Sequence, residues 1–118
     1  MRFTAQAGYA MVKKSIEIRH YRSPMKGFRF KQTTVFFDWY SAQNSKTQTV
    51  VSSRLRRIQN ESYFGWVKKF DGITELKWTS GLRLYLAEQG EVLMLLLGGN
   101  KNGQKKDIEE AKSLLEAL

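Results

Sequence analysis

Polar and apolar residues alternate in two parts of the chain, and this alternation predicts strands because successive side chains of a strand point to opposite faces. The first part is Ser15–Tyr21, in which Ile16 and Ile18 would face inward. The second part, residues 75–97, alternates at first and ends in the continuous apolar run Val92–Leu97. It predicts three strands, since it is divided by Ser80-Gly81 and Gln89-Gly90, dipeptides typical of hairpin turns.

Two-residue turns in the second part would fix which side chains share a face. They would set Trp78 opposite Arg83, and Tyr85 opposite both Leu76 and Met94. Because opposed residues point the same way, we expect Arg83, Trp78 and Tyr85 on one face. The other face would carry Leu82, Leu84, Leu86, Leu93, Leu95 and Leu97. Arg83 is then a fixed cation in the middle strand of an antiparallel meander.

Apolar residues at helical spacing predict three helices, two before the meander and one after it. The first runs from a cap at Thr33 or Thr34 to about residue 42, the second over residues 46–60, and the last over residues 104–117. We expect loops at residues 22–32 (basic), 61–71 (aromatic and lysine-rich) and 98–107 (glycine-rich). The order β-α-α-β-β-β-α predicts an α+β fold, an antiparallel-rich twisted sheet with two N-terminal helices and a C-terminal helix packed on it.

Length and charge narrow the class of protein. The 118 residues suit one domain at residues 15–118, while residues 1–14 read as an extension that could be disordered, with Met11 an alternative start. The formal net charge is +9, and residues 1–59 hold 12 Lys and Arg against two acidic residues. Such an imbalance predicts a polyanionic partner, most simply nucleic acid, although a solubilising surface is the plain alternative.

Several classes of site and location are disfavoured by composition. With no cysteine and one histidine, we expect no disulfide framework, no metal site and no cofactor. No apolar run is long enough to span a membrane, and the N-terminus lacks the apolar segment of a signal peptide. We therefore expect a cytoplasmic protein with no membrane partner. The aromatics of residues 61–71 could stack bases beside the lysines, but core packing is the better reading for Phe64 and Phe70.

The ordered motifs resemble those of a known family. These are the Asp71–Leu76 segment, Arg83-Leu84-Tyr85, the leucine-rich strand and Gly98-Gly99-Asn100-Lys101 followed by Gln104, Asp107 and Ile108. Together they resemble the RelE/ParE toxin superfamily over residues 15–112, and within it the HigB-like branch of addiction-module killer proteins. The chain departs from that branch at Asn100, where aspartate is common, at Leu82, where tyrosine is usual, and in lacking a tyrosine or histidine after Lys101.

The resemblance implies a type II toxin, an mRNA interferase that cleaves mRNA on the translating ribosome. Its implied partners are the ribosome, mRNA and a helix-turn-helix (HigA-like) antitoxin in a hetero-oligomer. The catalytic candidates are Arg83, Lys101, Lys68 and Lys77. The substrate-binding candidates are Tyr85, Trp78, Arg54, Arg56, Arg57, Gln104 and Asp107.

RNA cleavage without a metal needs three groups: a base for the 2′-hydroxyl, a cation for the phosphorane and an acid for the 5′-oxygen. Arg83 suits the second role because a guanidinium donates two parallel bonds to phosphate. Lys101 could stabilise charge or donate a proton, and Asp107 is the candidate base. Three alternatives stay open: a ParE-like DNA gyrase inhibitor, a non-catalytic basic nucleic-acid-binding or regulatory protein, and an Arg83 that only forms an ion pair on the sheet.

Overall fold

The computed structural model describes residues 15–118, so the expected extension at residues 1–14, with Met11, lies outside the described residues. The described part of the chain forms six strands, three α-helices and one 3₁₀ turn. In chain order these are β1 (Ile16–Arg22), β2 (Arg29–Gln32), α2 (Thr34–Ser41), α3 (Ser45–Glu61), β3 (Tyr63–Phe70), β4 (Ile73–Lys77), β5 (Leu82–Gln89), β6 (Val92–Asn100), η1 (Lys101–Gly103) and α4 (Gln104–Glu116). The α+β class is confirmed, but the predicted order lacked two of the strands.

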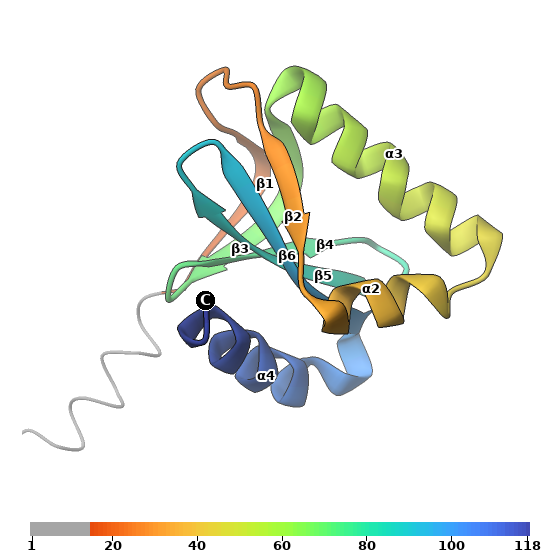
Figure 1. The fold of residues 1–118 in the computed structure, drawn as a ribbon. Helices are drawn as coiled ribbons and strands as arrows, with labels where there is room; N and C mark the ends of the chain where they lie inside the picture. The colour runs from red at the N-terminus through yellow and green to blue at the C-terminus, as the bar shows by residue number, and fades with distance from the viewer. Residues whose placement is uncertain (1–14) are drawn as a thin grey trace, which may run out of the picture.

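One mixed sheet contains all six strands, in the order β1-β3-β4-β5-β6-β2. The β2–β6 pair is parallel, and the other four pairs are antiparallel. Figure 1 shows the strongly twisted sheet with α3 along one side and α4 along the other. An antiparallel-rich twisted sheet is therefore confirmed.

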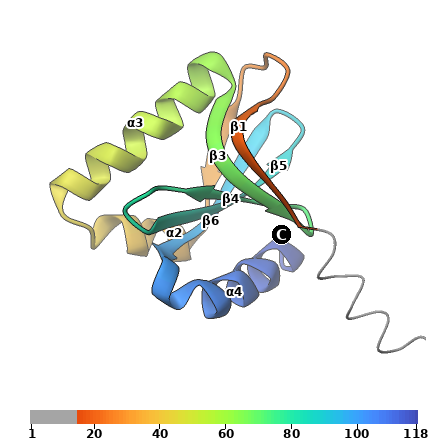
Figure 2. The ribbon, with the colours of Figure 1, turned by 180° about the vertical axis from the view of Figure 1, so that it is seen from behind.

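Two hydrophobic cores lie on the two faces of the sheet. Val51 and Ile58 of α3 belong to the first core, and Ala111 of α4 belongs to the second. The α2 helix begins after Thr33, whose side chain accepts the Phe36 N–H as the capping prediction requires. Seen from behind in Figure 2, α3 and α4 again lie on opposite sides of the sheet. The C-terminal helix thus packs on the face that α3 leaves uncovered.

The basic loop predicted at residues 22–32 is wrong for its last four residues, which form β2. This short edge strand alternates the exposed cations Arg29 and Lys31 with the half-buried Phe30. Charged residues commonly protect edge strands from further pairing. Its charges therefore made the segment look like a loop in the sequence.

The loop predicted at residues 61–71 is also wrong, because residues 63–70 form β3. A turn at Asp71 and Gly72 joins β3 to β4, and φ is positive at both residues, 51° and 80°. Two positive φ values are what a two-residue type I′ hairpin turn requires. Tyr63, Phe64 and Trp66 are therefore strand residues.

The predicted register of the meander is wrong. Lys77, not Trp78, pairs with Arg83, and Glu75, not Leu76, pairs with Tyr85. A four-residue connection, residues 78–81, separates β4 from β5, and the slip of one residue moves Trp78 to the opposite face.

A bulge displaces the next pair of strands. The predicted Tyr85–Met94 pair is wrong because the hairpin turns at Gly90 and Glu91, which sets Met94 opposite Ala87. The bulge then steps the β5–β6 ladder from Leu86 opposite Leu95 to Tyr85 opposite Leu97. Leu97 consequently packs in the second core instead of joining the other leucines.

None of the helices in residues 15–118 is both long and apolar enough to cross a bilayer.

Candidate functional site

Cationic and aromatic side chains from four neighbouring strands gather on the sheet face that carries α4. The register sets Lys68 beside Glu75 and, one row further along, sets Lys77 directly opposite Arg83. Because each of these pairs spans adjacent strands, their side chains point the same way. We call this surface the basic face and define it by Arg19, Trp66, Lys68, Lys77 and Arg83.

Arg83 lies at the base of the basic face, where its side chain is 9% exposed and that of Glu75 is fully buried. Its Nε lies 3.6 Å from Oε2 of Glu75, which is an ion-pair distance but longer than a hydrogen bond. Its Nη1 donates to the backbone carbonyls of Trp78 and Leu82, each at 2.9 Å. The ion pair that the sequence left open as a structural role for Arg83 is therefore present.

Glu75 connects this arginine to two other candidate residues. Its Oε2 accepts hydrogen bonds from Tyr85 Oη at 3.1 Å and from Gln104 Nε2 at 2.7 Å. Burial, followed by the charge of Glu75, raises the pKa of Tyr85, which keeps the phenol protonated as a donor. The prediction that Tyr85 stacks a base is wrong, because Tyr85 is fully buried. Substrate binding by Gln104 stays a prediction, and the Gln104 amide donates to Glu75.

Glu17 is the carboxylate on the β1 side of the basic face. Its Oε2 accepts a 2.7 Å hydrogen bond from Trp66 Nε1, and its Oε1 lies 3.6 Å from Lys77 Nζ. Chiefly this hydrogen bond, and then the charge of Lys77, lower the pKa of Glu17. Lys68 is its cross-strand partner. The structure thus brings two of the three candidate lysines, Lys68 and Lys77, together at Glu17.

The charges of this region leave a positive excess. Four cations (Arg19, Lys68, Lys77 and Arg83) face two carboxylates (Glu17 and Glu75), a formal balance of 4 − 2 = +2. A surface with such an excess attracts anions, and partial burial of Lys77 and Arg83 reduces screening by salt.

Lys101 begins the 3₁₀ turn η1, and the long glycine loop predicted before it is wrong because β6 continues to Asn100. The Lys101 N–H donates to the Gly81 carbonyl at 2.8 Å. A Cβ on Gly81 would lie 3.3 Å from Cγ and Cδ of Lys101, and φ at Gly81 is +102°. The exposed Lys101 is therefore anchored on the β4–β5 turn at Gly81, and Gly81 lies two residues before Arg83 in the sequence.

The paired glycines 98 and 99 are required by packing, because a side chain at either position would collide with a neighbour. A Cβ on Gly98 would lie 2.5 Å from the Trp39 ring, and one on Gly99 would collide with the Asp107 carboxylate. Gly99 is the ladder partner of Arg83, so Asp107 lies beside the same row. Burial, and then the charge of Glu110, raise the pKa of Asp107.

Arg54 has a structural role, which corrects its assignment as a substrate-binding residue. Its guanidinium donates to three backbone carbonyls, those of Phe64 (2.9 Å), Trp66 (2.6 Å) and Lys77 (2.5 Å). It fills the gap where β4 diverges from β3 and lies 4.4 Å from the ring of Trp78. Trp78 packs against the first core, so it is also removed from the Arg83 face.

The other two arginines of α3 remain on the surface. Arg56 is exposed, and Arg57 lies 4.2 Å from the Tyr63 ring while its Nε lies 3.2 Å from Glu61 Oε1. Both arginines stay candidates for nucleic-acid phosphates. They are not part of the basic face.

Three residues at the basic face were not among the candidates from the sequence: Glu17, Arg19 and Glu75. Trp66 was included there only with the other aromatics of residues 61–71 that could stack bases. The alternation of Glu17, Ile18 and Arg19 already placed both charged residues on the outer face of β1. For Trp66 and Glu75 the available signal was the Asp-Gly turn, which makes β3 and β4 a hairpin.

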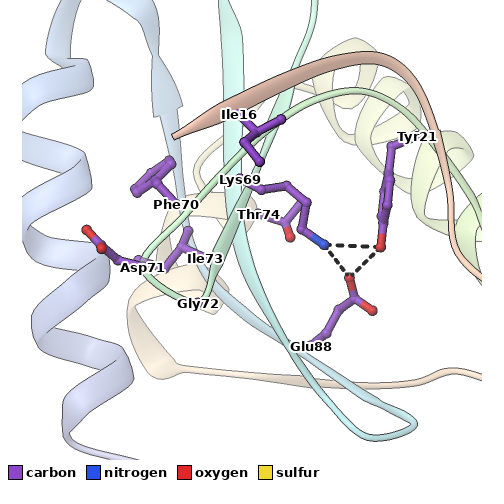
Figure 3. A pocket seen from close by; sticks show the side chains of 9 residues that line it. All are labelled: Ile16, Tyr21, Lys69, Phe70, Asp71, Gly72, Ile73, Thr74 and Glu88. Atoms are coloured by element: carbon purple, nitrogen blue, oxygen red, sulfur yellow. Dashed lines mark hydrogen bonds and ion pairs between the residues drawn. The ribbon is translucent and has the colours of Figure 1, made fainter. Parts of the chain in front are cut away.

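A hollow of about 500 Å³ lies away from the basic face, around the β3–β4 turn. Figure 3 shows Lys69, Tyr21 and Glu88 pointing toward one another in it. Lys69 Nζ lies 3.1 Å from Tyr21 Oη and 3.2 Å from Glu88 Oε2, so these groups satisfy one another. The hollow has no excess of positive charge to attract an anion, since Asp71 and Glu88 line it together with Lys69. We therefore favour the basic face as the functional site. Within residues 15–118 no three histidine, aspartate or glutamate side chains are grouped as metal ligands.

Comparisons with known proteins give one relative. No family model matches the chain, and no solved structure matches it. A Haemophilus influenzae protein, named only as an uncharacterized protein, is 39% identical over 95 residues, which cover 76% of this chain and 95% of that protein. The name of this relative assigns no activity. The chain belongs to the same family as this Haemophilus protein.

Proposed function

We propose that this chain is the toxin of a type II toxin–antitoxin module, a HigB-like member of the RelE/ParE superfamily with a RelE-like arrangement of sheet and helices. In this proposal it cleaves mRNA on the translating ribosome. The observation that carries it is the direct opposition of Lys77 and Arg83 at the basic face, with Lys101 anchored on the adjoining turn. Convergent cations from separate segments suit a phosphate that gains charge during reaction.

The proposed reaction is a metal-independent transesterification. The 2′-oxygen attacks phosphorus, the bond to the 5′-oxygen breaks, and a 2′,3′-cyclic phosphate and a 5′-hydroxyl are formed. Arg83 and Lys77 stabilise the phosphorane, and Lys101 donates the proton to the 5′-oxygen. Asp107 is the candidate acceptor of the 2′-hydroxyl proton, since it lies against the ladder partner of Arg83 and burial raises its pKa, which makes the carboxylate a stronger base.

The proposed partners are the ribosome with its mRNA and a helix-turn-helix antitoxin, in a cytoplasmic hetero-oligomer.

A second candidate is a basic nucleic-acid-binding protein without catalysis. The observation that favours it is the burial of Arg83, which already contacts Glu75 and two carbonyls. Nδ1 of the single histidine, His20, lies 2.8 Å from Tyr63 Oη, so this ring nitrogen is already engaged and is not a free base for a 2′-hydroxyl.

Induced expression in a bacterium tests these functions together. We expect growth arrest and transcripts cut at translated positions, with co-expressed antitoxin restoring growth. Intact mRNA with accumulating gyrase–DNA breaks would instead indicate the ParE-like activity. Continued growth with intact mRNA and DNA would favour the second candidate, a nucleic-acid-binding protein without catalysis.

A further inference from the structure

Trp66 differs from the other two tryptophans, all of which lie in the described residues. Trp39 and Trp78 pack against the first core, whereas Trp66 packs against neither core. Its ring is half-buried on the basic face. Core packing therefore does not account for this indole, which lies on the sheet surface outside both cores.

Local backbone irregularities turn Trp66 outward. Phe64 and Val67 both pack in the first core, although strict alternation would put them on opposite faces. Gly65 between them has φ of +79°, and β1 has a bulge in which Arg19 and His20 lie opposite Trp66. The indole orientation is then fixed by the 2.7 Å hydrogen bond from Nε1 to Glu17.

Three cations from three different strands surround this ring. Arg19 Cζ lies 4.4 Å from the ring centroid, Lys77 Nζ lies 4.8 Å from it, and Arg83 Cζ lies 5.7 Å from it. Cations within about 6 Å of an aromatic face are attracted by its quadrupole. The protein therefore combines one oriented aromatic platform with several phosphate-binding groups in a single place.

We propose that Trp66 is a nucleobase-stacking site for single-stranded RNA, with a neighbouring phosphate bound by Lys77 and Arg83. This inference rests on the proposed RNA-directed function, and it assigns the binding of one nucleobase to Trp66. The guanidinium of the exposed Arg19 moves aside to admit the base and then pairs with the RNA backbone. Because Glu17 already orients the indole, little side-chain entropy is lost on binding. Stacking of this kind accepts any base, so the site selects single strands over duplexes.

Two oligonucleotides test this proposal: a 2′-O-methyl oligouridine of about ten nucleotides, which resists cleavage, and a 2′-O-methyl ribose-phosphate chain of equal length without bases. Both carry the same phosphate charge. We expect the wild-type protein to bind the oligouridine on the order of tenfold more tightly than the abasic chain, the ratio expected from one stacked base.

Variants at Trp66 test whether the preference for the oligouridine comes from the indole ring. Trp66→Leu keeps an apolar side chain without a π face and should bind both oligonucleotides equally, with the wild-type affinity for the abasic chain. Trp66→Phe should retain part of the preference. Phe37→Ala removes an exposed aromatic ring from α2 and should leave the preference unchanged. Melting curves check that each variant is folded.

An unchanged preference in folded Trp66→Leu would overturn the assignment of Trp66. Equal binding of both oligonucleotides by the wild-type protein would also overturn it, while RNA binding through phosphates would stand. Failure of the wild-type protein to bind either oligonucleotide at low salt would reject the RNA-directed function together with the stacking site.

Discussion

Arg83 and Glu75 form a buried ion pair, with Nε and Oε2 3.6 Å apart and with no hydrogen-bond partner for Arg83 Nε or for Glu75 Oε1 among the described residues. The two residues lie on adjacent strands but are not directly opposed, since Lys77 is the ladder partner of Arg83. Their charges compensate each other where neither is solvated. The pair also connects the basic face to the first turn of α4 through Gln104.

Removing Arg83 should therefore affect stability as well as activity. We expect Arg83→Ala to lower the free energy of unfolding by about 3–5 kcal/mol, because Glu75 would remain buried without a counter-ion. The sequence alone suggested that Arg83 is a phosphate ligand, with an ion pair on the sheet as the alternative. Urea unfolding at pH 7 measures the difference.

The double variant Glu75→Gln/Arg83→Ala separates charge from packing. The amide introduced by Glu75→Gln would keep an oxygen for Tyr85 and Gln104 but would no longer need a cation, so the double variant should regain part of the lost stability. Wild-type stability in Arg83→Ala would instead mean that Glu75 does not depend on the arginine.

Arg54 leads to a different expectation, since it binds three carbonyls. Arg54→Met should be clearly destabilising, by about 1–3 kcal/mol for each buried carbonyl that water cannot reach. Arg54→Lys should restore only part of this, because an ammonium cannot span three acceptors as the guanidinium fork does. Arg56→Met, an exposed neighbour on the same helix, is the control and should change stability by no more than about 0.5 kcal/mol. Equal unfolding midpoints for Arg54→Met and Arg56→Met would contradict the structural role.

The role of Arg54 could not be predicted from the sequence. An arginine on a helix flank reads as a solvated charge, and only the divergence of β4 from β3 leaves carbonyls for it to bind. Such gaps depend on tertiary geometry. The Arg83–Glu75 pair was partly predictable, because an unpaired charge in a central strand is rare, but the choice of Glu75 required the register.

Register accounts for most of the other differences between prediction and structure. The Ser80-Gly81 dipeptide correctly marks a turn, but the connection has four residues, and this moves Trp78 from the Arg83 face to the first core. The Asp71-Gly72 dipeptide was a strong hairpin signal that predicts β3. Helix limits were nearly correct because capping is local: Thr33 and Asn44 both accept N–H groups of the helices they precede.

Asp107 gives a pH dependence. Burial, followed by Glu110, raises its pKa in the folded protein, although a position in the first turn of α4 favours a negative charge. Between the unfolded pKa, about 3.9, and the higher folded pKa, the folded state binds more protons, so stability falls as the pH rises. We expect Asp107→Asn to melt at a higher temperature than the wild type at pH 7.

This advantage should disappear on acidification to about pH 3, where the carboxyl is protonated in both states. Melting temperatures between pH 3 and pH 8 measure it, with Glu109→Gln, an exposed change in the same helix, as the control. If the difference in melting temperature between Asp107→Asn and the wild type does not vary with pH, the charge of Asp107 does not destabilise the folded protein.

Lys101 is the cation whose removal should separate catalysis from folding most cleanly. Its side chain is exposed and lies across Gly81, while its backbone N–H, which survives mutation, makes the contact that anchors the turn. Lys101→Ala should therefore retain the fold and the melting temperature. It should slow cleavage of ribosome-bound mRNA on the order of a hundredfold, as expected for one acid or electrostatic group.

The matched control is Lys105→Ala, which replaces an exposed lysine one turn further along and should cleave at the wild-type rate. If Lys101→Ala and Lys105→Ala cleave equally fast, the proton donor lies elsewhere on the basic face, and Lys77, the direct partner of Arg83, becomes the residue to replace next.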